Sequence, residues 1–258
     1  MTGNETHSDL RLNCSLQHYA LFLDVDGTLL PITTRHYEVR VPAALISLLQ
    51  SLREELRGAL ALISGRAIAD LDDLFAPLVL PAAGIHGLER RRYDDDYYRN
   101  ENTNLLEPLR HPLEAFVRER HGLLLEDKGL SLALHYRMAP EREVEVLRHL
   151  NHMIDRTQSK LEVKRGKMVF EVKPKGGDKG TAIDAFMNEQ PFKGRKPIFL
   201  GDDVTDEDGF ATVNRLDGIS VKVGATESTL ASQCLPDEAA VHAWLEYLAK
   251  MESRYSKP

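Results

Sequence analysis

The stretch ALFLDVDGTLL, residues 20–30, decides the fold of this chain. An apolar run of strand length ends in two aspartates, Asp24 and Asp26, separated by one residue. Side chains alternate along a strand, so both carboxylates start on one face, and Gly27 lets the backbone turn away after them. Two like charges this close are costly unless a cation lies between them or one keeps its proton. The pattern favours a chemical site over its alternative, a solvated Asp-Gly turn.

Length and composition indicate a globular, acidic protein. The chain has 258 residues, of which 42% are hydrophobic and 28% charged, enough for one large domain or two modest ones. The formal charge of −7 disfavours nonspecific binding to nucleic acid or to an anionic membrane. The polar segment 1–13 lacks the apolar core of a signal peptide, and no apolar run approaches the ~20 residues of a membrane span. Cys14 and Cys234 show no metal-binding or redox spacing, so we expect two ordinary thiols and a cytoplasmic location.

Strands and helices alternate on either side of a differently patterned middle segment. Outside that segment we expect helices over 41–57, 67–75, 179–188, 206–216 and 242–251, and further strands over 59–63, 197–200 and 219–223. This alternation predicts an α/β fold with a doubly wound parallel sheet. Residues 105–173 follow the order α-β-β-α-β-β, typical of an α+β module with antiparallel hairpins. We therefore predict one domain formed by residues 1–104 and 174–258, into which residues 105–173 are inserted.

Polar residues directly follow two further strands of the expected sheet, and another stands at the first position of a helix. Ser64 follows strand 59–63, Asp202 follows strand 197–200, and Lys179 begins a helix. The carboxyl ends of parallel strands meet at one edge, where ligands bind, so these side chains should converge with Asp24 and Asp26. Three carboxylates suit Mg²⁺, whereas a hydroxyl and an ammonium can hold phosphoryl oxygens. A carboxylate could then attack phosphorus and form an aspartyl phosphate.

Each of these segments has an ordinary structural explanation when it is taken alone. The pair Ser64-Gly65 is typical of a loop, Lys179 of a solvated surface charge, and the run 201–208 of a helix N-terminus rich in acids. Their order within one alternating framework is what supports the prediction of a site.

The same residues resemble the four motifs of the haloacid dehalogenase superfamily: DVDGT at 24–28, Ser64, Lys179, and GDD at 201–203. A closer resemblance is to the trehalose-6-phosphate phosphatases, in LISGR at 62–66, GIHGLE at 84–89 and LGDDVTDE at 200–207. Blocks of the inserted segment also resemble that family: EDK at 126–128, HYR at 135–137, GK at 166–167 and EVKP at 171–174. The resemblance spans nearly the whole chain and implies a haloacid dehalogenase-like core with an inserted cap domain.

The resemblance implies a Mg²⁺-dependent phosphatase that converts trehalose 6-phosphate into trehalose and phosphate, as part of trehalose biosynthesis. Asp24 would be the nucleophile and a metal ligand. Asp26 would act as general acid and then general base, and would contact the metal through its backbone carbonyl. Asp202 would complete the metal site. The phosphoryl oxygens would be held by three side chains: Thr28, Ser64 and Lys179.

The resemblance also assigns sugar recognition to the inserted segment, through Glu126, Lys128, Arg137, Lys167 and Glu171. In the core, Arg66 and His86 would lie nearer the phosphate, and Asp203 and Asp206 beside the metal's direct ligands. Independently of any family, the residues of each of the pairs 126/128, 135/137 and 167/171 share one strand parity, so each pair can face one side of its sheet. Such charged groups suit a substrate made of hydroxyls. The alternative is the solvated face of a half-buried hairpin.

Two other classes of function remain open. The same core could serve another sugar phosphate, such as sucrose phosphate or a hexose phosphate, or a phosphomutase, and only the cap would discriminate. A phosphoryl-accepting switch is disfavoured because Asp26 would promote rapid dephosphorylation. A silent partner domain of a trehalose-synthesising enzyme is disfavoured because every motif residue is present. A P-loop enzyme is not supported, since residues 175–181 lack the Walker spacing. We expect a monomer that binds a small substrate rather than nucleic acid or a membrane.

Overall fold

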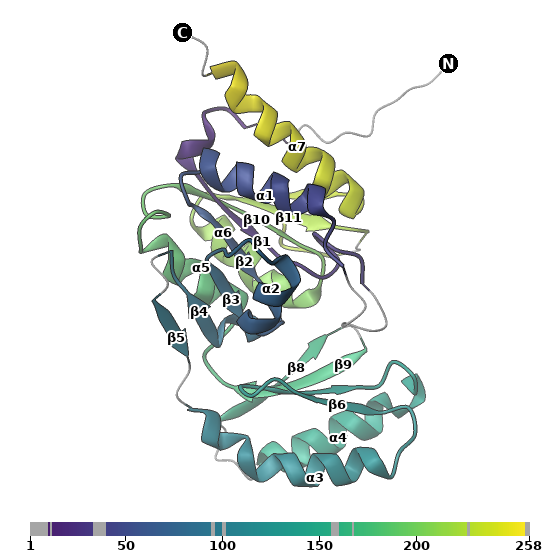
Figure 1. Cartoon of the computed structure of the whole chain (residues 1–258). Coiled ribbons are helices and arrows are strands. Elements are labelled where there is room, and N and C mark those ends of the chain that lie inside the picture. Colours follow the sequence, from purple (N-terminus) through teal and green to yellow (C-terminus); the bar gives the residue numbers. More distant parts are fainter. Residues whose placement is uncertain are drawn as a thin grey trace, which may run out of the picture.

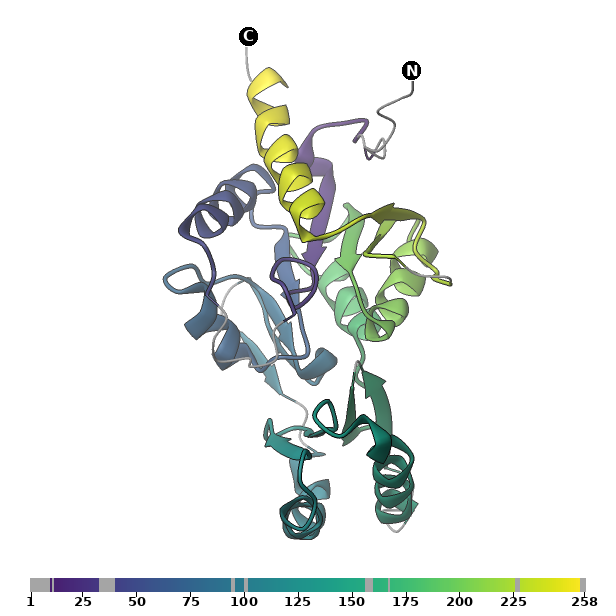
Figure 2. The same ribbon diagram turned by 90° about the vertical axis from the view of Figure 1, so that its right-hand side faces the viewer.

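A computed structural model of the chain describes residues 10, 12–32, 40–93, 96–99, 102–155, 160–166, 168–225 and 228–255. The molecule has two parts, a core built on a large sheet and a smaller module with a sheet of its own, hereafter the cap. In Figures 1 and 2 the cap lies at the end of the core opposite to the C-terminal helix α7.

The core sheet has eight strands in the order β12-β11-β10-β1-β2-β3-β4-β5. Their bounds are β1 Tyr19–Leu23, β2 Leu60–Ile63, β3 Ala82–Gly84, β4 Glu89–Arg91, β5 Tyr97–Arg99, β10 Lys196–Gly201, β11 Ile219–Val223 and β12 Gln233–Leu235. From β12 to β3 neighbouring strands pair in parallel, and only β4 and β5 are antiparallel. Leu23 of β1 is in register with Leu62 and Leu200, so the residues after β1, β2 and β10 lie at one edge. The predicted parallel α/β sheet is confirmed.

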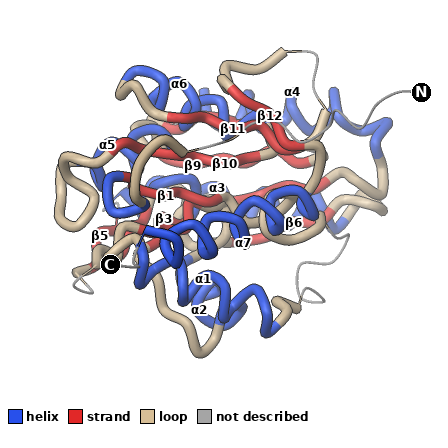
Figure 3. Tube along the Cα trace, turned by 90° about the horizontal axis from the view of Figure 1, so that it is seen from above, coloured by secondary structure: helices blue, strands red, loops and turns tan. Residues whose placement is uncertain are grey.

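Helices cover both faces of this sheet, and the view from above shows helices on either side of the strands (Figure 3). The helices of one face are α1 Ala43–Glu55, α2 Ile68–Phe75 and α7 Glu238–Tyr255, and those of the other are α5 Lys179–Met187 and α6 Glu207–Arg215. Leu21 and Leu23 pack into the first layer, whereas Ala20 and Phe22 pack into the second. Because β1 is buried on both faces, its sequence is an unbroken apolar run rather than an alternating one.

The cap is an antiparallel sheet in the order β6-β7-β9-β8, covered by two helices. Its elements are α3 Glu107–Arg118, β6 Leu124–Asp127, β7 Leu132–His135, α4 Glu143–Ile154, β8 Leu161–Gly166 and β9 Val169–Pro174. The order α-β-β-α-β-β agrees with the prediction. Phe170 and Val172 belong to the hydrophobic core under the helices. By strand alternation, Glu171 between them points to the opposite face, which lies toward the core of the molecule (Figure 1).

Helix α7 begins at Glu238 instead of residue 242, and the edge strand β12 was not expected. Two of the three residues of β12 are exposed, so that no apolar pattern marks this strand. Among the described residues, no helix combines the length and the apolar character needed to cross a membrane.

The return from cap to core is short and internally bonded. Lys173 of β9 is fully buried, and its Nζ donates to the carbonyl of Gly177 and lies 3.5 Å from Glu162 Oε1. The carboxylate of Asp178 then accepts from Thr181 N at 2.7 Å and caps helix α5. The strand that carries Glu171 therefore leads directly to the helix that begins with Lys179.

Candidate active site

Three carboxylates and one ammonium meet at the carboxyl edge of the core sheet. Asp24 follows β1, and its Oδ1 accepts from Lys179 Nζ at 2.6 Å. The same Nζ donates to Asp206 Oδ1 at 2.5 Å. One oxygen each of Asp24, Asp202 and Asp206 lies within 4.8 Å of the others. The structure thus brings together the aspartates of β1 and β10 and the lysine of α5, as the parallel-sheet rule predicts.

Burial governs the charges of this group. It raises the pKa of Asp24 well above its usual range, and Asp206 and Asp202 add to that shift against the effect of Lys179. Burial and the charge of Asp206 raise the pKa of Asp202 to about 7. Burial opposes the charge of Lys179, but the carboxylates of Asp206 and Asp24 raise the pKa of its ammonium above the ordinary value.

The donor set fits a hard divalent cation. Oδ1 of Asp202 is buried and has no hydrogen-bond partner, beside two further carboxylates. Carboxylate oxygens of this kind are what Mg²⁺ takes as protein ligands. Gly27 makes the approach possible: its φ is 88°, and a Cβ at that position would overlap the Asp202 carboxylate. The glycine of the DVDGT motif is therefore required for the close approach of Asp202 as well as for its turn.

Asp206 is more central than the sequence indicated. We expected it beside the metal's direct ligands, and it supplies one of the three clustered carboxylates. Its Oδ2 also accepts from the backbone N–H of Asp203 at 2.9 Å, and its Oδ1 accepts from Lys179. The sequence signal that could have found it is its place three residues after Asp203, since the two form a capping box.

Asp26 pairs with an arginine and is not one of the three clustered carboxylates. Arg66 Nε donates to Asp26 Oδ2 at 2.7 Å, and Nη2 donates to Oδ1 at 2.6 Å. The backbone N–H of Arg66 donates to Ser64 Oγ at 3.1 Å. Thr28 is fully buried, and its Oγ1 has no hydrogen-bond partner. Ser64 follows β2 and Thr28 follows β1, and both side chains are buried.

On the opposite side, cap residues contact the core directly. Glu171 Oε2 lies 2.8 Å from His86 Nε2, and its Oε1 accepts from the hydroxyl of Ser131. Lys128 Nζ donates to the carbonyl of Gly65 at 2.9 Å and lies 3.5 Å from Glu171 Oε1. Burial opposes ionisation of Glu171, but Lys128 and His86 lower the pKa of its carboxyl far below the usual range. His86, predicted near the phosphate, therefore pairs with the predicted sugar-binding carboxylate.

Core and cap groups line one cleft of about 1000 Å³. Of the residues predicted to be catalytic, to bind the metal directly or to bind substrate, all but Thr28 and Lys167 line it: Asp24, Asp26, Ser64, Arg66, His86, Glu126, Lys128, Arg137, Glu171, Lys179 and Asp202. Glu126 Oε2 lies 2.8 Å from His135 Nε2, another residue of the cleft wall. Thr28 is fully buried and is not among the residues that line the cleft, and Lys167 lies outside the described residues.

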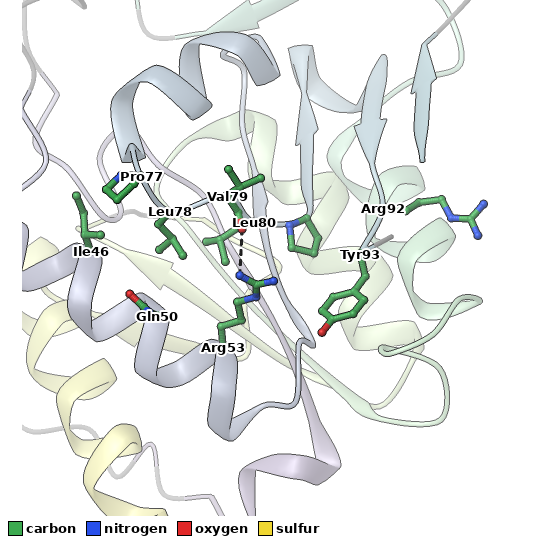
Figure 4. A pocket seen from close by; sticks show the side chains of 10 residues that line it. Ile46, Gln50, Arg53, Pro77, Leu78, Val79, Leu80, Arg92 and Tyr93 are labelled. Carbon is green, nitrogen blue, oxygen red and sulfur yellow. Dashed lines mark hydrogen bonds between the residues drawn. The ribbon is translucent and has the colours of Figure 1, made fainter. Parts of the chain in front are cut away.

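A second cavity, of about 380 Å³, lies between α1, the segment 77–81 and the residues that follow β4 (Figure 4). Arg53 Nη1 donates to the Val79 carbonyl at 3.4 Å there, and Arg92 and Tyr93 line the other side. Its lining contains no aspartate, glutamate, histidine or serine, whereas all four kinds of residue line the larger cleft. The larger cleft is therefore the candidate active site.

A doubly wound core with paired aspartates after its central strand, joined to an inserted cap, is the architecture of the haloacid dehalogenase superfamily. A crystal structure titled as a trehalose-6-phosphate phosphatase related protein has this fold, with a TM-score of 0.78 and 25% identity over 92% of this chain and 99% of that one. A family model described as Trehalose-phosphatase matches residues 22–237.

Curated relatives agree with the family model. The trehalose-6-phosphate phosphatase of Escherichia coli is 44% identical over 231 residues, which cover 89% of this chain and 86% of that protein. The probable trehalose-phosphate phosphatase of Sinorhizobium fredii is 43% identical over 213 residues, 83% of this chain and 80% of that protein. The chain belongs to the trehalose-phosphatase family, and the predicted phosphatase class is confirmed.

Proposed function

We propose that this chain hydrolyses trehalose 6-phosphate to trehalose and phosphate in trehalose biosynthesis, through an aspartyl phosphate on Asp24. The observation that supports this most is the cleft, which is lined both by Asp24 and Lys179 of the core and by Lys128 and Glu171 of the cap. One side of the cleft suits a phosphoryl group, and the other offers charged hydrogen-bonding groups to a sugar. We also propose the boundaries 1–104 and 174–258 for the core and 105–173 for the cap.

Asp24 begins the reaction. One of its carboxylate oxygens attacks phosphorus, the bond from phosphorus to the sugar oxygen breaks, and that oxygen takes a proton from Asp26. Asp26 then removes a proton from a water molecule that attacks the aspartyl phosphate, and the bond from phosphorus to Asp24 breaks. Arg66 donates to both oxygens of Asp26, which fixes the orientation of this carboxylate in the ionised form that serves as general base in the second step.

The remaining residues hold the phosphoryl group. Ser64, Thr28 and Lys179 supply donors for its oxygens, and Lys179 is already fixed by two carboxylates. Asp24 and Asp202, with the Asp26 carbonyl, would hold Mg²⁺, whose charge would offset that of the phosphoryl oxygens. Asp206 adjoins this group and orients Lys179.

A monomer in the cytoplasm is part of the proposal. Cys14 and Cys234 are exposed free thiols, which suits a reducing compartment.

Phosphate release from a panel of sugar phosphates, measured with and without a chelator, tests the proposal. We expect trehalose 6-phosphate to give a kcat/KM well above those of sucrose phosphate and the hexose phosphates, and we expect chelation to abolish it. Equal rates across the panel would contradict the assigned substrate. Full activity after exhaustive removal of metal would contradict the metal site.

A further inference from the structure

A strained turn on the core side of the cleft carries His86. Ile85 and His86 have left-handed backbone angles, with φ of 47° and 52°. Such angles are costly for any residue with a Cβ, and most of all for a β-branched one. The turn is held because Ile85 N donates to the Arg66 carbonyl at 2.9 Å and His86 N donates to the Ser64 carbonyl at 3.0 Å. Strain of this kind persists where the surroundings fix it, and it is common at functional sites.

The turn presents one particular nitrogen of His86 to the cap. The ring lies against Gly65, where a Cβ would be 2.7 Å from Cε1 and Nε2. Nε2 is 2.8 Å from Glu171 Oε2, and because an ionised carboxylate only accepts, Nε2 carries the proton and donates. Nδ1 is buried and makes no hydrogen bond. Burial lowers the pKa of His86 despite the charge of Glu171, which agrees with a neutral ring whose Nδ1 is unprotonated.

We propose that His86 is a positioning residue for sugar recognition: its Nε2 fixes the orientation of the cap carboxylate Glu171. The inference rests on the proposed function, and it moves His86 from the phosphate side of the site to the sugar side. It also makes the core a partner in a task that the sequence assigned to the cap alone.

Neighbouring contacts support this role. Glu171 has one oxygen on His86 and the other on the hydroxyl of Ser131. Lys128 is fixed in turn by the carbonyl of Gly65, the residue on which the His86 ring lies. A side chain that is oriented before substrate arrives loses less conformational entropy on binding. His86 should therefore act mainly on KM for the sugar substrate.

Glutamine and asparagine at position 86 separate this role from a purely structural one. The amide nitrogen of glutamine reaches about as far as Nε2, whereas that of asparagine reaches only as far as Nδ1. Asparagine tolerates left-handed backbone better than glutamine does. A residue retained for its backbone would favour His86→Asn, and a residue retained for its contact with Glu171 would favour His86→Gln.

We expect His86→Gln to keep kcat/KM for trehalose 6-phosphate within about threefold of the unmodified enzyme, and His86→Asn to lower it about twentyfold, mainly through KM. With p-nitrophenyl phosphate, which has no sugar, the loss in His86→Asn should be several-fold smaller. In a Glu171→Ala background the difference between glutamine and asparagine should disappear. His111→Gln is the matched control, because His111 is 95% exposed on α3, and it should leave both substrates unaffected.

Thermal unfolding of each variant shows whether the fold is kept. The inference is overturned if His86→Asn retains more activity than His86→Gln, if both substrates lose equally, or if the difference persists without Glu171. An unmodified enzyme that does not hydrolyse trehalose 6-phosphate overturns the proposed function, and the inference with it.

Discussion

The two ends of the cleft are built on different principles. At the core end, Lys179, Asp24 and Asp206 are 3%, 4% and 0% exposed and are bonded to one another within a single part of the molecule. At the cap end, Glu171 and Lys128 are held by groups of the other part, the His86 ring and the Gly65 carbonyl. The cluster of Lys179, Asp24 and Asp206 is thus held within the core alone, whereas Glu171 and Lys128 are held only when core and cap are together. Changes at the core end should affect every substrate, and changes at the cap end only those with a sugar.

The largest effect should follow from removing the nucleophile. Asp24→Asn should lower kcat for both trehalose 6-phosphate and p-nitrophenyl phosphate at least about 10⁴-fold, since no other group at the site can take the phosphoryl bond. Phosphate release under single-turnover conditions measures this. Asp184→Asn, at a surface aspartate paired with Arg215, is the control and should be near normal. A residual rate in Asp24→Asn that is close to normal would remove the aspartyl phosphate from the mechanism.

A smaller and selective effect is expected at the cap end. Glu171→Ala should raise KM for trehalose 6-phosphate about thirtyfold, because it removes a charged hydrogen-bond acceptor and leaves Lys128 without its neighbour. KM for p-nitrophenyl phosphate should change much less. Steady-state kinetics with both substrates tests the difference between the two ends directly. Equal changes for both substrates would mean that the cap does not recognise the sugar.

Proton competition at the metal site should give a further effect, at the core end only. The pKa of Asp202 is raised to about 7 by burial and by the charge of Asp206. Below that pH the carboxyl is protonated and must lose its proton to bind a cation, so affinity falls as pH falls. Between pH 8 and pH 6 the half-activating Mg²⁺ concentration should rise at least about tenfold, the value for the Asp202 proton alone, since the pKa of Asp24 is raised as well. A Mg²⁺ titration of activity at each pH measures this, and a pH-independent midpoint would contradict it.

The smallest effect should come from the ion pair that joins the two parts outside the predicted sugar contacts. Lys164 Nζ of β8 lies 2.8 Å from Asp208 Oδ2 of α6, and the two side chains are 33% and 41% exposed. Pairs of this exposure contribute at most about 1 kcal/mol, so Lys164→Glu should raise KM no more than about fivefold. Adding Asp208→Lys should restore it, and high salt should erase the difference. If the double variant Lys164→Glu/Asp208→Lys has the same KM as Lys164→Glu alone, the ion pair does not contribute to the docking of the cap.

Much of the fold could be predicted because the local pattern of apolar residues indicates which faces of a strand or helix are buried. The run before Asp24 is apolar at every position since β1 is buried on both faces, and the parallel-sheet rule then places Asp202 and Lys179 near it. The edge strand β12 escaped because most of its residues are exposed, so that no apolar pattern marks it.

The pairings within the site could not be predicted in the same way. Asp26 and Arg66 lie on two different strand ends, and which guanidinium faces which carboxylate depends on side-chain conformations that no periodicity encodes. The contact between His86 and Glu171 crosses from core to cap, and it depends on a left-handed turn at two residues that are not glycine. Sequence patterns indicate faces of strands and helices, but they do not indicate which groups meet across two modules.

The short return from cap to core has a consequence for protein engineering. The strand β9 passes from Glu171 through the buried Lys173, whose ammonium is bonded to the Gly177 carbonyl, and the helix with Lys179 begins two residues later. If the cap were replaced by a foreign module to give a new specificity, the last strand of that module would take the place of β9. The bond between Lys173 and the Gly177 carbonyl would then be lost unless the new strand also carried a lysine there. Such a chimera needs a lysine at position 173 and an accessible carbonyl at 177, so that the start of the helix that carries Lys179 keeps its position.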